Sequence, residues 1–234
     1  MREVVIAGPK MNALSERLMT SLLEQVRGAG DEPLLLRGEG DRAFSAGLDL
    51  EEVSGLDVEG MGRFLTLLRD ISAALFDHPA PTVALVNGHA IAGGCVLALC
   101  CDLRVGTSDP RARIGLNEVA LGLEFPPGIL RMLRHQLPCS LLERALLGAG
   151  LHDPLAAQRL GLLDEVVDDA NSVARERLEA MAAYPRRAYT ATKRVLRRDV
   201  TKVTPDEERL FRAEVVPVWT SPEVKERMRG FLKK

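Results

Sequence analysis

The sequence predicts an α/β protein whose core is a parallel sheet. Short apolar segments typical of buried strands alternate with longer segments in which apolar residues recur at helical spacing. This strand–helix–strand order, repeated at short intervals, favours parallel pairing through right-handed crossovers. At 234 residues, 46% of them hydrophobic, the chain is long enough to bury a substantial core.

The first half of the chain supplies most of the predicted strands and the helices between them. Four apolar segments are expected to form buried strands: Val4–Ala7, Pro33–Arg37, Thr82–Val86 and Leu103–Val105. Three segments with helical spacing are expected to connect them: Ser15–Arg27, Val58–Phe76 and the stretch His89–Asp102. The pair Pro79 and Pro81 ends the second of these helices, because proline cannot continue the hydrogen-bonding pattern.

After about Pro126 the pattern becomes mostly helical. Helices are expected at Ser140–Leu147, from Asp153 onward, and at Asn171–Tyr184, Arg186–Arg197, Pro205–Val215 and Ser221–Leu232. Ser140–Leu147 is expected to begin with a good cap, and Asp153 should cap the helix that Pro154 opens. Only Leu163–Val167 is expected to be extended here.

Composition and charge exclude several classes of function. The formal net charge is −2 and the charges are interspersed, which argues against a nucleic-acid surface. No apolar run is long enough to cross a bilayer, and the apolar start is too short for a secretory signal. The four cysteines and four histidines show no zinc-site spacing. We therefore expect a cytoplasmic, metal-free protein that binds neither nucleic acid nor membrane.

Two glycine-containing turns are the first candidates for function. Gly93 and Gly94 precede an apolar helical segment, where the first backbone N–H groups lack an internal acceptor and glycine lets a ligand approach closely. The lysine and Ser/Thr of a phosphate-binding P-loop are missing, so phosphate is disfavoured. A second turn, Ser45-Ala46-Gly47, follows a predicted strand and leads into Leu48. Two such turns holding one oxygen would form an oxyanion hole.

Three sequence blocks together resemble the signature of a known family. "AFSAGLDL" at 43–50, "VNGHAIAGGCVLALCCDLRVG" at 86–106 and "RIGLNEVALGL" at 113–123 are similar to those of the crotonase superfamily, the enoyl-CoA hydratase/isomerase family. Lys10-Met-Asn-Ala-Leu14 resembles the family's N-terminal element. The order and spacing of the blocks agree with the family, and weaker similarity runs from the first strand to the last helix.

The resemblance implies a fold, a ligand and an assembly. It implies a spiral of ββα units over residues 1–170, which would carry the thioester site, and a helical trimerisation region over residues 171–234. The ligand would be an acyl-CoA thioester, with coenzyme A as part of the substrate and no other cofactor. Its oxygen would be held by the N–H groups of Leu48 and Gly93, with Ala46 and Gly94 beside them. The partner would be further copies of the chain, in a homotrimer or a dimer of trimers.

The acid–base residues distinguish the reactions of the family. Hydratases of the family use two glutamates, and the positions that match them here are Val96 and Glu118. Valine cannot transfer a proton, whereas moving a double bond needs only one base, which takes a proton from C2 and returns it to C4. "IGLNE" resembles the Δ3,Δ2-enoyl-CoA isomerase branch, which works with a single glutamate. Isomerase is therefore the first interpretation.

Glu118 is expected to be buried by Leu116, Val119 and the acyl chain, which would raise its pKa toward the working pH. An arbitrary loop glutamate is usually solvated, but the matched block favours catalysis. Glu124 is a minor alternative, because a second carboxylate on its loop would permit hydration. Hydration with a relocated acid, thioester hydrolysis and a non-catalytic acyl-CoA-binding subunit remain the alternatives.

Other polar residues near the blocks have structural interpretations. Ser45 lacks the motif of a nucleophile elbow and is expected to be a turn residue. His89 is expected to be structural, Asp49 to cap a helix, and Asp102 to end the apolar helix or pair with a nearby arginine. Cys95 is expected to be an inert buried thiol.

The aromatic and basic residues of the C-terminal region are expected to have structural roles or to meet the ligand from outside the motif blocks. Trp219 and Phe211 are expected to make core or trimer contacts. The basic residues of 184–198 are expected to be solvated, or in part to meet the phosphates of coenzyme A.

Overall fold

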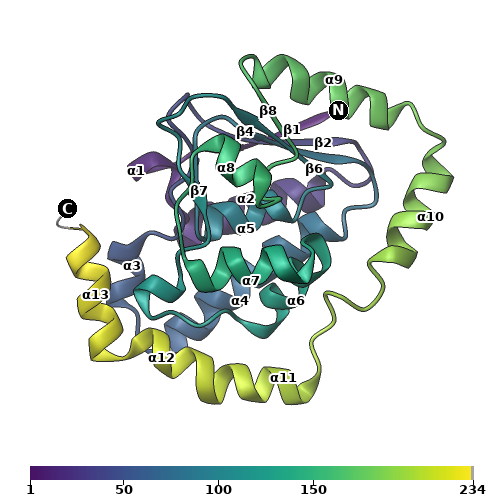
Figure 1. Ribbon diagram of the computed structural model, residues 1–234. Coiled ribbons are helices and arrows are strands. Elements are labelled where there is room, and N and C mark those ends of the chain that lie inside the picture. Colours follow the sequence, from purple (N-terminus) through teal and green to yellow (C-terminus); the bar gives the residue numbers. More distant parts are fainter. Residues whose placement is uncertain (233–234) are drawn as a thin grey trace.

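The computed structural model describes residues 1–232 and confirms the α/β core (Figure 1). Its larger sheet has five strands in the order β1-β2-β4-β6-β8, and every neighbouring pair is parallel. The strands are β1 (Arg2–Ile6), β2 (Leu34–Gly38), β4 (Thr82–Val86), β6 (Leu103–Thr107) and β8 (Glu165–Val167). Each of the five lies within or overlaps a segment that the sequence analysis predicts to be extended.

A second sheet was not predicted. It contains three short parallel strands in the order β3-β5-β7, namely β3 (Ala43–Ser45), β5 (His89–Ile91) and β7 (Ile114–Gly115). The expectation of one helix over His89–Asp102 is therefore wrong at its start, because the first three residues pair with two other strands. Only α5 (Gly93–Leu99) is helical there.

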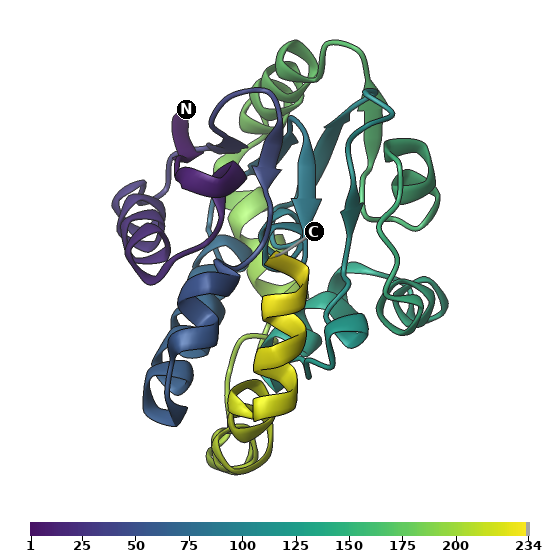
Figure 2. The same ribbon diagram turned by 90° about the vertical axis from the view of Figure 1, so that its left-hand side faces the viewer.

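Helices cover both faces of the larger sheet (Figures 1 and 2). On one face lie α2 (Glu16–Gly28) and α4 (Val58–Phe76), as expected, and their buried residues belong to the main core together with α5. Ser15 caps α2 by accepting a hydrogen bond from the Leu18 N–H. On the other face, α9 (Ala170–Ala182) packs Ala174 and Leu178 against the strands.

Two predicted helix starts differ in outcome. Asp153 caps α8 (Pro154–Arg159) through a hydrogen bond from the Ala156 N–H, as expected. The helix expected at Ser140–Leu147 is α7 (Cys139–Gly148), which begins one residue earlier after Pro138 and has no side-chain cap. The N-cap position is thus Pro138, whose ring has no acceptor, and Ser140 is already inside the first helical turn. Three further elements were not predicted as helices: α1 (Pro9–Asn12), η1 (Val119–Leu121) and α6 (Pro127–Gln136). Helix α3 (Leu50–Gly55) is the one that Asp49 was expected to cap.

The last part of the chain runs around the core as a belt of helices (Figure 1). Its elements are α10 (Arg186–Leu196), α11 (Pro205–Leu210), the π-helix η2 (Phe211–Val215), α12 (Val216–Thr220) and α13 (Pro222–Leu232). The π-turn lies just before Pro217, which cannot donate a backbone hydrogen bond. Helix α13 ends beside α3, so the C-terminal segment returns to the N-terminal half of the molecule.

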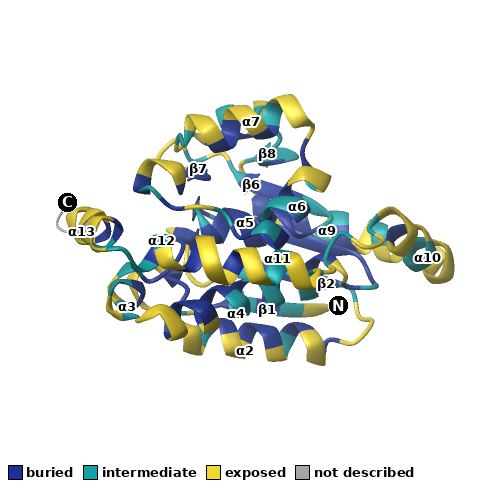
Figure 3. Ribbon diagram, turned by 90° about the horizontal axis from the view of Figure 1, so that it is seen from below, coloured by how far each residue is buried: buried dark blue, intermediate teal, exposed yellow. Residues whose placement is uncertain are grey.

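The pattern of burial follows this layout. Most residues of β2 and β4, all of α5 and the inner sides of α2 and α4 are buried, whereas α10 and α11 carry many exposed residues (Figure 3). No helix in residues 1–232 combines the length and the apolar character that crossing a bilayer requires. The division into residues 1–170 and 171–234 stays a prediction.

Candidate active site

The three strands of the smaller sheet end beside one cavity of about 320 Å³. The carboxyl ends of parallel strands lie at the same edge of a sheet, so the residues that follow β3, β5 and β7 gather there. The cavity is lined mainly by apolar side chains: Met11, Ala46, Leu48, Leu50, Leu68, Ile91, Ala92, Gly93, Val96, Asn117, Glu118, Leu121, Leu123, Phe125, Pro126, Ile129, Leu151, Trp219 and Phe231.

The turn after β3 presents the N–H of Leu48. Leu14 N–H donates to the Gly47 carbonyl at 2.7 Å, and Asp49 N–H donates to the Leu14 carbonyl at 3.0 Å. Because neighbouring peptide groups of an extended chain point to opposite sides, the Leu48 N–H points away from Leu14. No acceptor among the described residues takes this N–H.

The turn after β5 presents the N–H of Gly93. Ala92 has φ 47° and ψ −120°, a strained conformation for a residue with a side chain, and it turns the chain from the strand into α5. Gly93 is the first residue of α5, so its N–H has no partner within the helix. A strained residue directly before an unsatisfied N–H is typical of a functional turn.

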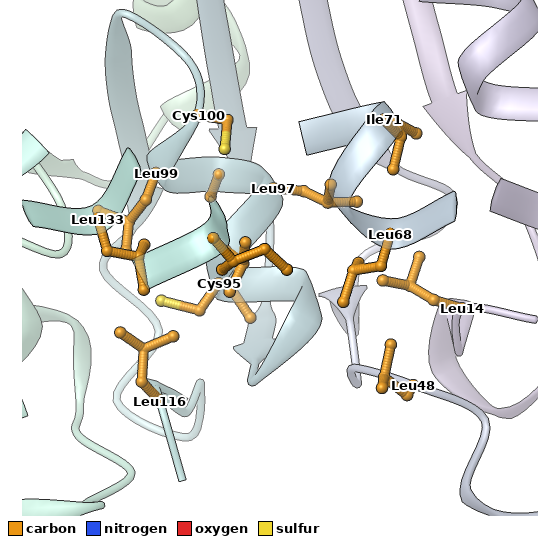
Figure 4. Close-up of a cluster of buried hydrophobic side chains, with 14 of the residues drawn as sticks. Leu14, Leu48, Leu68, Ile71, Cys95, Leu97, Leu99, Cys100, Leu116 and Leu133 are labelled. Atoms are coloured by element: carbon orange, nitrogen blue, oxygen red, sulfur yellow. The ribbon is translucent and has the colours of Figure 1, made fainter. Parts of the chain in front are cut away.

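The two turns touch one another. A Cβ atom on Gly47 would lie 2.8 Å from the Ile91 carbonyl oxygen, and one on Gly93 would lie 3.0 Å from Leu48 Cδ2. The structure therefore brings Leu48 and Gly93 together at the cavity wall. Figure 4 shows the side chains of Leu14, Leu48 and Leu68 on one side of α5, with Cys95, Leu116 and Leu133 on the other.

Gly94 lies differently from the other predicted site residues. It is buried, but it is not among the residues that line the cavity. A Cβ atom at this position would lie 2.6 Å from the Ser45 carbonyl oxygen. The absence of a side chain at Gly94 thus permits α5 to approach the first turn, whereas Ala46 lies on the cavity wall itself.

Glu118 is the one ionisable side chain among the described residues that line the cavity. It follows β7, it is 6% exposed, and its Oε2 atom has no hydrogen-bond partner in the structure. Burial raises the pKa of this carboxyl to about 8, because the apolar surroundings disfavour the anion. A buried carboxyl with one free oxygen and this pKa is suited to accept and return a proton near neutral pH.

The surroundings of Glu118 differ in part from the expectation. Leu116 is fully buried as predicted, but Val119 is 43% exposed, so it does not cover the carboxyl. Val119 begins the short helix η1, whose turn directs its side chain outward. Leu121 and Leu123, whose N–H groups both donate to the Glu118 carbonyl at 2.9 Å, are buried and line the cavity instead.

Neither Val96 nor Glu124 supplies a second carboxylate to the cavity. Val96 is buried on the cavity wall within the first turn of α5 after Gly93. Glu124 has an exposed side chain and does not line the cavity, and only its backbone carbonyl is engaged, by the indole N–H of Trp219 at 2.9 Å. The suggestion that Glu124 supplies a second acid to the cavity is not supported by this placement.

Four polar or thiol residues have the structural surroundings that were expected. Ser45 is fully buried with its hydroxyl hydrogen-bonded, and Asp49 caps α3 by accepting from the N–H groups of the first turn. His89 Nδ1 accepts a hydrogen bond from the Arg113 N–H. The Cys95 thiol is fully buried, and burial raises its pKa above the ordinary value.

Part of the basic segment near the C-terminus is not available to a ligand. Lys193 and Arg197 form ion pairs with Asp102 at 2.8 Å, and all three side chains are almost completely buried. Asp102 does pair with an arginine, but the partner is Arg197, which is distant in the sequence and not the nearby residue that was expected. The expectation of a solvated basic face is wrong for these two residues.

Several cavity residues were missed as site residues. Asn117 is 8% exposed, lines the cavity and has no partner for its Oδ1 atom. Asn117 is next to Glu118 in the block "IGLNE", and this position could have indicated that it is a site residue. Trp219 and Phe231 also line the cavity, although nothing local in the sequence connects them with residues more than 100 positions earlier. No group of three His, Cys, Asp or Glu side chains in residues 1–232 is arranged to hold a metal ion.

Comparison with known proteins agrees with this geometry. The enoyl-CoA hydratase/isomerase family model matches residues 2–234. Mitochondrial enoyl-CoA delta isomerase 1 of Mus musculus is 33% identical over 199 residues, which are 82% of this chain and 69% of that protein. A crotonyl-CoA hydratase of Syntrophomonas wolfei is 31% identical over 161 residues, 67% of this chain and 61% of that protein.

The fold agrees as well. The crystal structure of human mitochondrial delta3-delta2-enoyl-CoA isomerase matches with a TM-score of 0.87 and 26% identity, over 97% of this chain and 90% of that one. The spiral α/β fold expected from the motif blocks is thus confirmed. With its two amide-bearing turns and its buried glutamate, the chain belongs to the enoyl-CoA hydratase/isomerase family of acyl-CoA-processing enzymes.

Proposed function

We propose that this enzyme is an enoyl-CoA isomerase that moves a double bond from C3 to C2 of an acyl-CoA thioester. The observation that carries the proposal is that two free backbone N–H groups and one buried carboxyl group line the same cavity. One base is sufficient for isomerisation, whereas hydration also requires water to be activated.

In this mechanism the thioester oxygen accepts hydrogen bonds from the N–H groups of Leu48 and Gly93. The Glu118 carboxylate removes a proton from C2, and the electron pair of that C–H bond becomes the dienolate with its charge on the thioester oxygen. The two N–H groups stabilise this charge without reorganising. Glu118 then returns the proton to C4, which leaves the double bond between C2 and C3. Coenzyme A is part of the substrate, and the steps require no other cofactor.

Hydration with a relocated acid is the second candidate, since both an isomerase and a hydratase are among the similar proteins. Val96 and the exposed Glu124 count against it, because neither places a second carboxyl in the cavity. A non-catalytic acyl-CoA-binding subunit is the third candidate. The raised pKa of Glu118 favours catalysis over this alternative.

The test is to incubate the enzyme with 3-enoyl-CoA and with 2-enoyl-CoA, and to repeat both assays with Glu118→Gln. Glutamine keeps the shape of the side chain but cannot take up a proton, so we expect turnover of 3-enoyl-CoA to fall at least a hundredfold. Binding of acyl-CoA should persist, because the Leu48 and Gly93 N–H groups are unchanged. Glu124→Gln is the matched control and should retain the normal rate.

The products distinguish the three candidates. Conversion of 3-enoyl-CoA to 2-enoyl-CoA without hydroxyacyl product supports the isomerase. Hydroxyacyl product supports hydration, and binding without turnover supports the third candidate. A near-normal isomerase rate in Glu118→Gln would end the assignment of that residue.

We also propose that the enzyme assembles as a homotrimer or a dimer of trimers. In support, α10 and the residues beside it expose Tyr184, Val195 and Leu196, which are large apolar side chains. Analytical ultracentrifugation measures the mass of the assembly. A monomer at micromolar concentration would contradict the proposal.

A further inference from the structure

Ser45 lies between the two amide-bearing turns and is completely buried. It is the last residue of β3, and neither the oxyanion hole nor the proton transfer of the proposed function uses its side chain. A buried hydroxyl needs hydrogen-bond partners, and both partners of the Ser45 hydroxyl are backbone groups, those of Asn12 and Gly47.

The hydroxyl of Ser45 fixes the turn after β3, which leads through Gly47 to Leu48. The Ser45 Oγ–H donates to the Asn12 carbonyl at 2.8 Å, and Oγ accepts from the Gly47 N–H at 3.2 Å. Gly47 has φ 91°, and the peptide group that follows it carries the Leu48 N–H. Because glycine readily adopts other conformations, this hydrogen bond restricts the residue that aims the Leu48 N–H.

Asn12 is itself firmly held, so it can serve as an anchor. Its Nδ2 donates to the Ala43 carbonyl at 2.9 Å and to the Glu39 carbonyl at 3.0 Å. Its backbone has φ 59°, as the last of three successive left-handed residues, a conformation that persists only when the surroundings enforce it. The hydroxyl of Ser45 therefore links Gly47, a residue type with wide conformational freedom, to the firmly held backbone of Asn12.

The backbone of Ser45 supports the second turn. A Cβ atom on Gly94 would lie 2.6 Å from the Ser45 carbonyl oxygen and 2.8 Å from Ser45 Cβ. The first turn of α5, whose leading N–H belongs to Gly93, thus rests directly on Ser45. One residue contacts the backbone on both sides of the oxyanion hole.

We propose that Ser45 is a positioning residue that sets the direction of the Leu48 N–H and its separation from the Gly93 N–H. This inference rests on the proposed function, because it concerns the oxygen that these two groups hold. Without the hydroxyl, Gly47 loses its acceptor and the first turn can relax toward another glycine conformation. A displacement of about 1 Å at a reacting centre can lower a rate by roughly a hundredfold.

The kinetic test compares Ser45→Ala with Ser72→Ala. Ser72 is a matched control, since it is also fully buried and its hydroxyl donates to the Leu68 carbonyl within α4, away from both turns. We expect Ser45→Ala to lower kcat roughly tenfold to a hundredfold with little change in KM. Ser72→Ala should leave both values near those of the wild type. Equal losses in the two variants would overturn the inference.

A spectroscopic test separates this inference from the proposed function. The infrared stretching frequency of a carbon-13 thioester carbonyl is measured in 2-enoyl-CoA, free and bound to each variant. Hydrogen bonds from Leu48 and Gly93 polarise the carbonyl, so we expect a downward shift in the wild type and in Ser72→Ala, and a smaller one in Ser45→Ala. No shift in the wild type would contradict the oxyanion hole itself. A full shift in Ser45→Ala would contradict only the role of Ser45.

Ser45→Cys keeps the experiment decisive if Ser45→Ala does not fold. A thiol is a weaker donor and acceptor than a hydroxyl. We therefore expect Ser45→Cys to give a smaller downward shift of the carbonyl frequency and a lower kcat than the wild type. Wild-type values for both quantities in a variant with normal binding would refute the positioning role.

Discussion

Glu118 owes its chemistry to its position in the fold. A glutamate in water has a pKa of 4.5 and would be a poor base at neutral pH, whereas the buried Glu118 has a pKa raised to about 8 by loss of hydration. The Oε2 atom has no hydrogen-bond partner, and a hydrogen bond with the residue's own backbone lowers the pKa by less than burial raises it. The substrate-free enzyme therefore holds a largely protonated carboxyl at neutral pH.

The pH dependence of the reaction should report this group. Only the carboxylate can remove the C2 proton, so kcat/KM for 3-enoyl-CoA should rise with pH and level off above a midpoint near 8. Initial rates measured across this range in buffers of constant ionic strength provide the check. A midpoint near 4.5 would show that Glu118 is hydrated in the working enzyme.

The same shift has a consequence for stability. The pKa of Glu118 is higher in the folded state than in the unfolded state, so the folded protein binds the extra proton. The favourable contribution is fully present below pH 4.5 and is lost as pH rises through about 8. Glu118→Gln carries no such loss, so its free energy of unfolding relative to the wild type should increase over this interval. Urea unfolding at both ends of the interval measures the difference, and a constant difference would contradict the shift.

At the scale of elements, the small sheet β3-β5-β7 is what assembles the site. Each of its strands has only two or three residues, and each is followed directly by a turn or helix that lines the cavity. Such short strands contribute little stability of their own. Their parallel pairing instead brings residues 46–48, 92–93 and 117–118 to one edge.

Gly94→Ala tests how closely these elements must approach. The added methyl group would lie 2.6 Å from a backbone oxygen of Ser45, which cannot rotate away as a side chain would. Helix α5 must then shift, and we expect turnover to fall by roughly a hundredfold, because small displacements at the reacting centre are costly. Steady-state assays provide the measurement.

Gly28→Ala is the control for this substitution. Gly28 ends α2 and has no atom within 4 Å of an added Cβ, so activity should be unchanged and stability should rise slightly. Normal turnover in Gly94→Ala would show that the two turns can separate without loss of function.

For the whole molecule, one buried carboxylate joins the C-terminal belt to the core. Asp102 follows α5 and accepts hydrogen bonds from the Thr82 N–H, the Tyr189 hydroxyl and the Lys193 ammonium group, each at 2.8 Å. Arg197 completes the cluster. Burial lowers the pKa of Lys193 despite this pairing. The buried charges of Asp102 and Lys193 therefore stabilise one another, and removing one leaves the other uncompensated.

Asp102→Asn should therefore destabilise the enzyme strongly. It leaves two buried cations without a counter-charge, which typically costs about 3–5 kcal/mol. We expect a large fall in Tm and faster amide exchange across residues 186–196, which the cluster holds against the core. Asp206→Asn is the control, because the exposed pair of Asp206 with Arg209 should contribute less than about 1 kcal/mol. Similar Tm values for the two variants would contradict the role of the cluster.

Local pattern in the sequence determined much of this protein. The spacing of apolar residues predicted α2, α4 and the strands of the larger sheet, since that spacing reflects which side of an element faces the core. The glycines of both turns and Glu118 were predicted because the motif blocks preserve their order and spacing. The family membership followed from the same blocks.

Only the tertiary structure decided the rest. The strands β3, β5 and β7 are too short to show a period, so their pairing becomes visible only when they lie side by side. Segments far apart in the chain determine that Glu118 is buried and that Trp219 lines the cavity. The pairing of Asp102 with Arg197 likewise joins distant positions. Local periodicity records how a segment divides between core and solvent, whereas contacts between distant segments are fixed by how the finished elements pack.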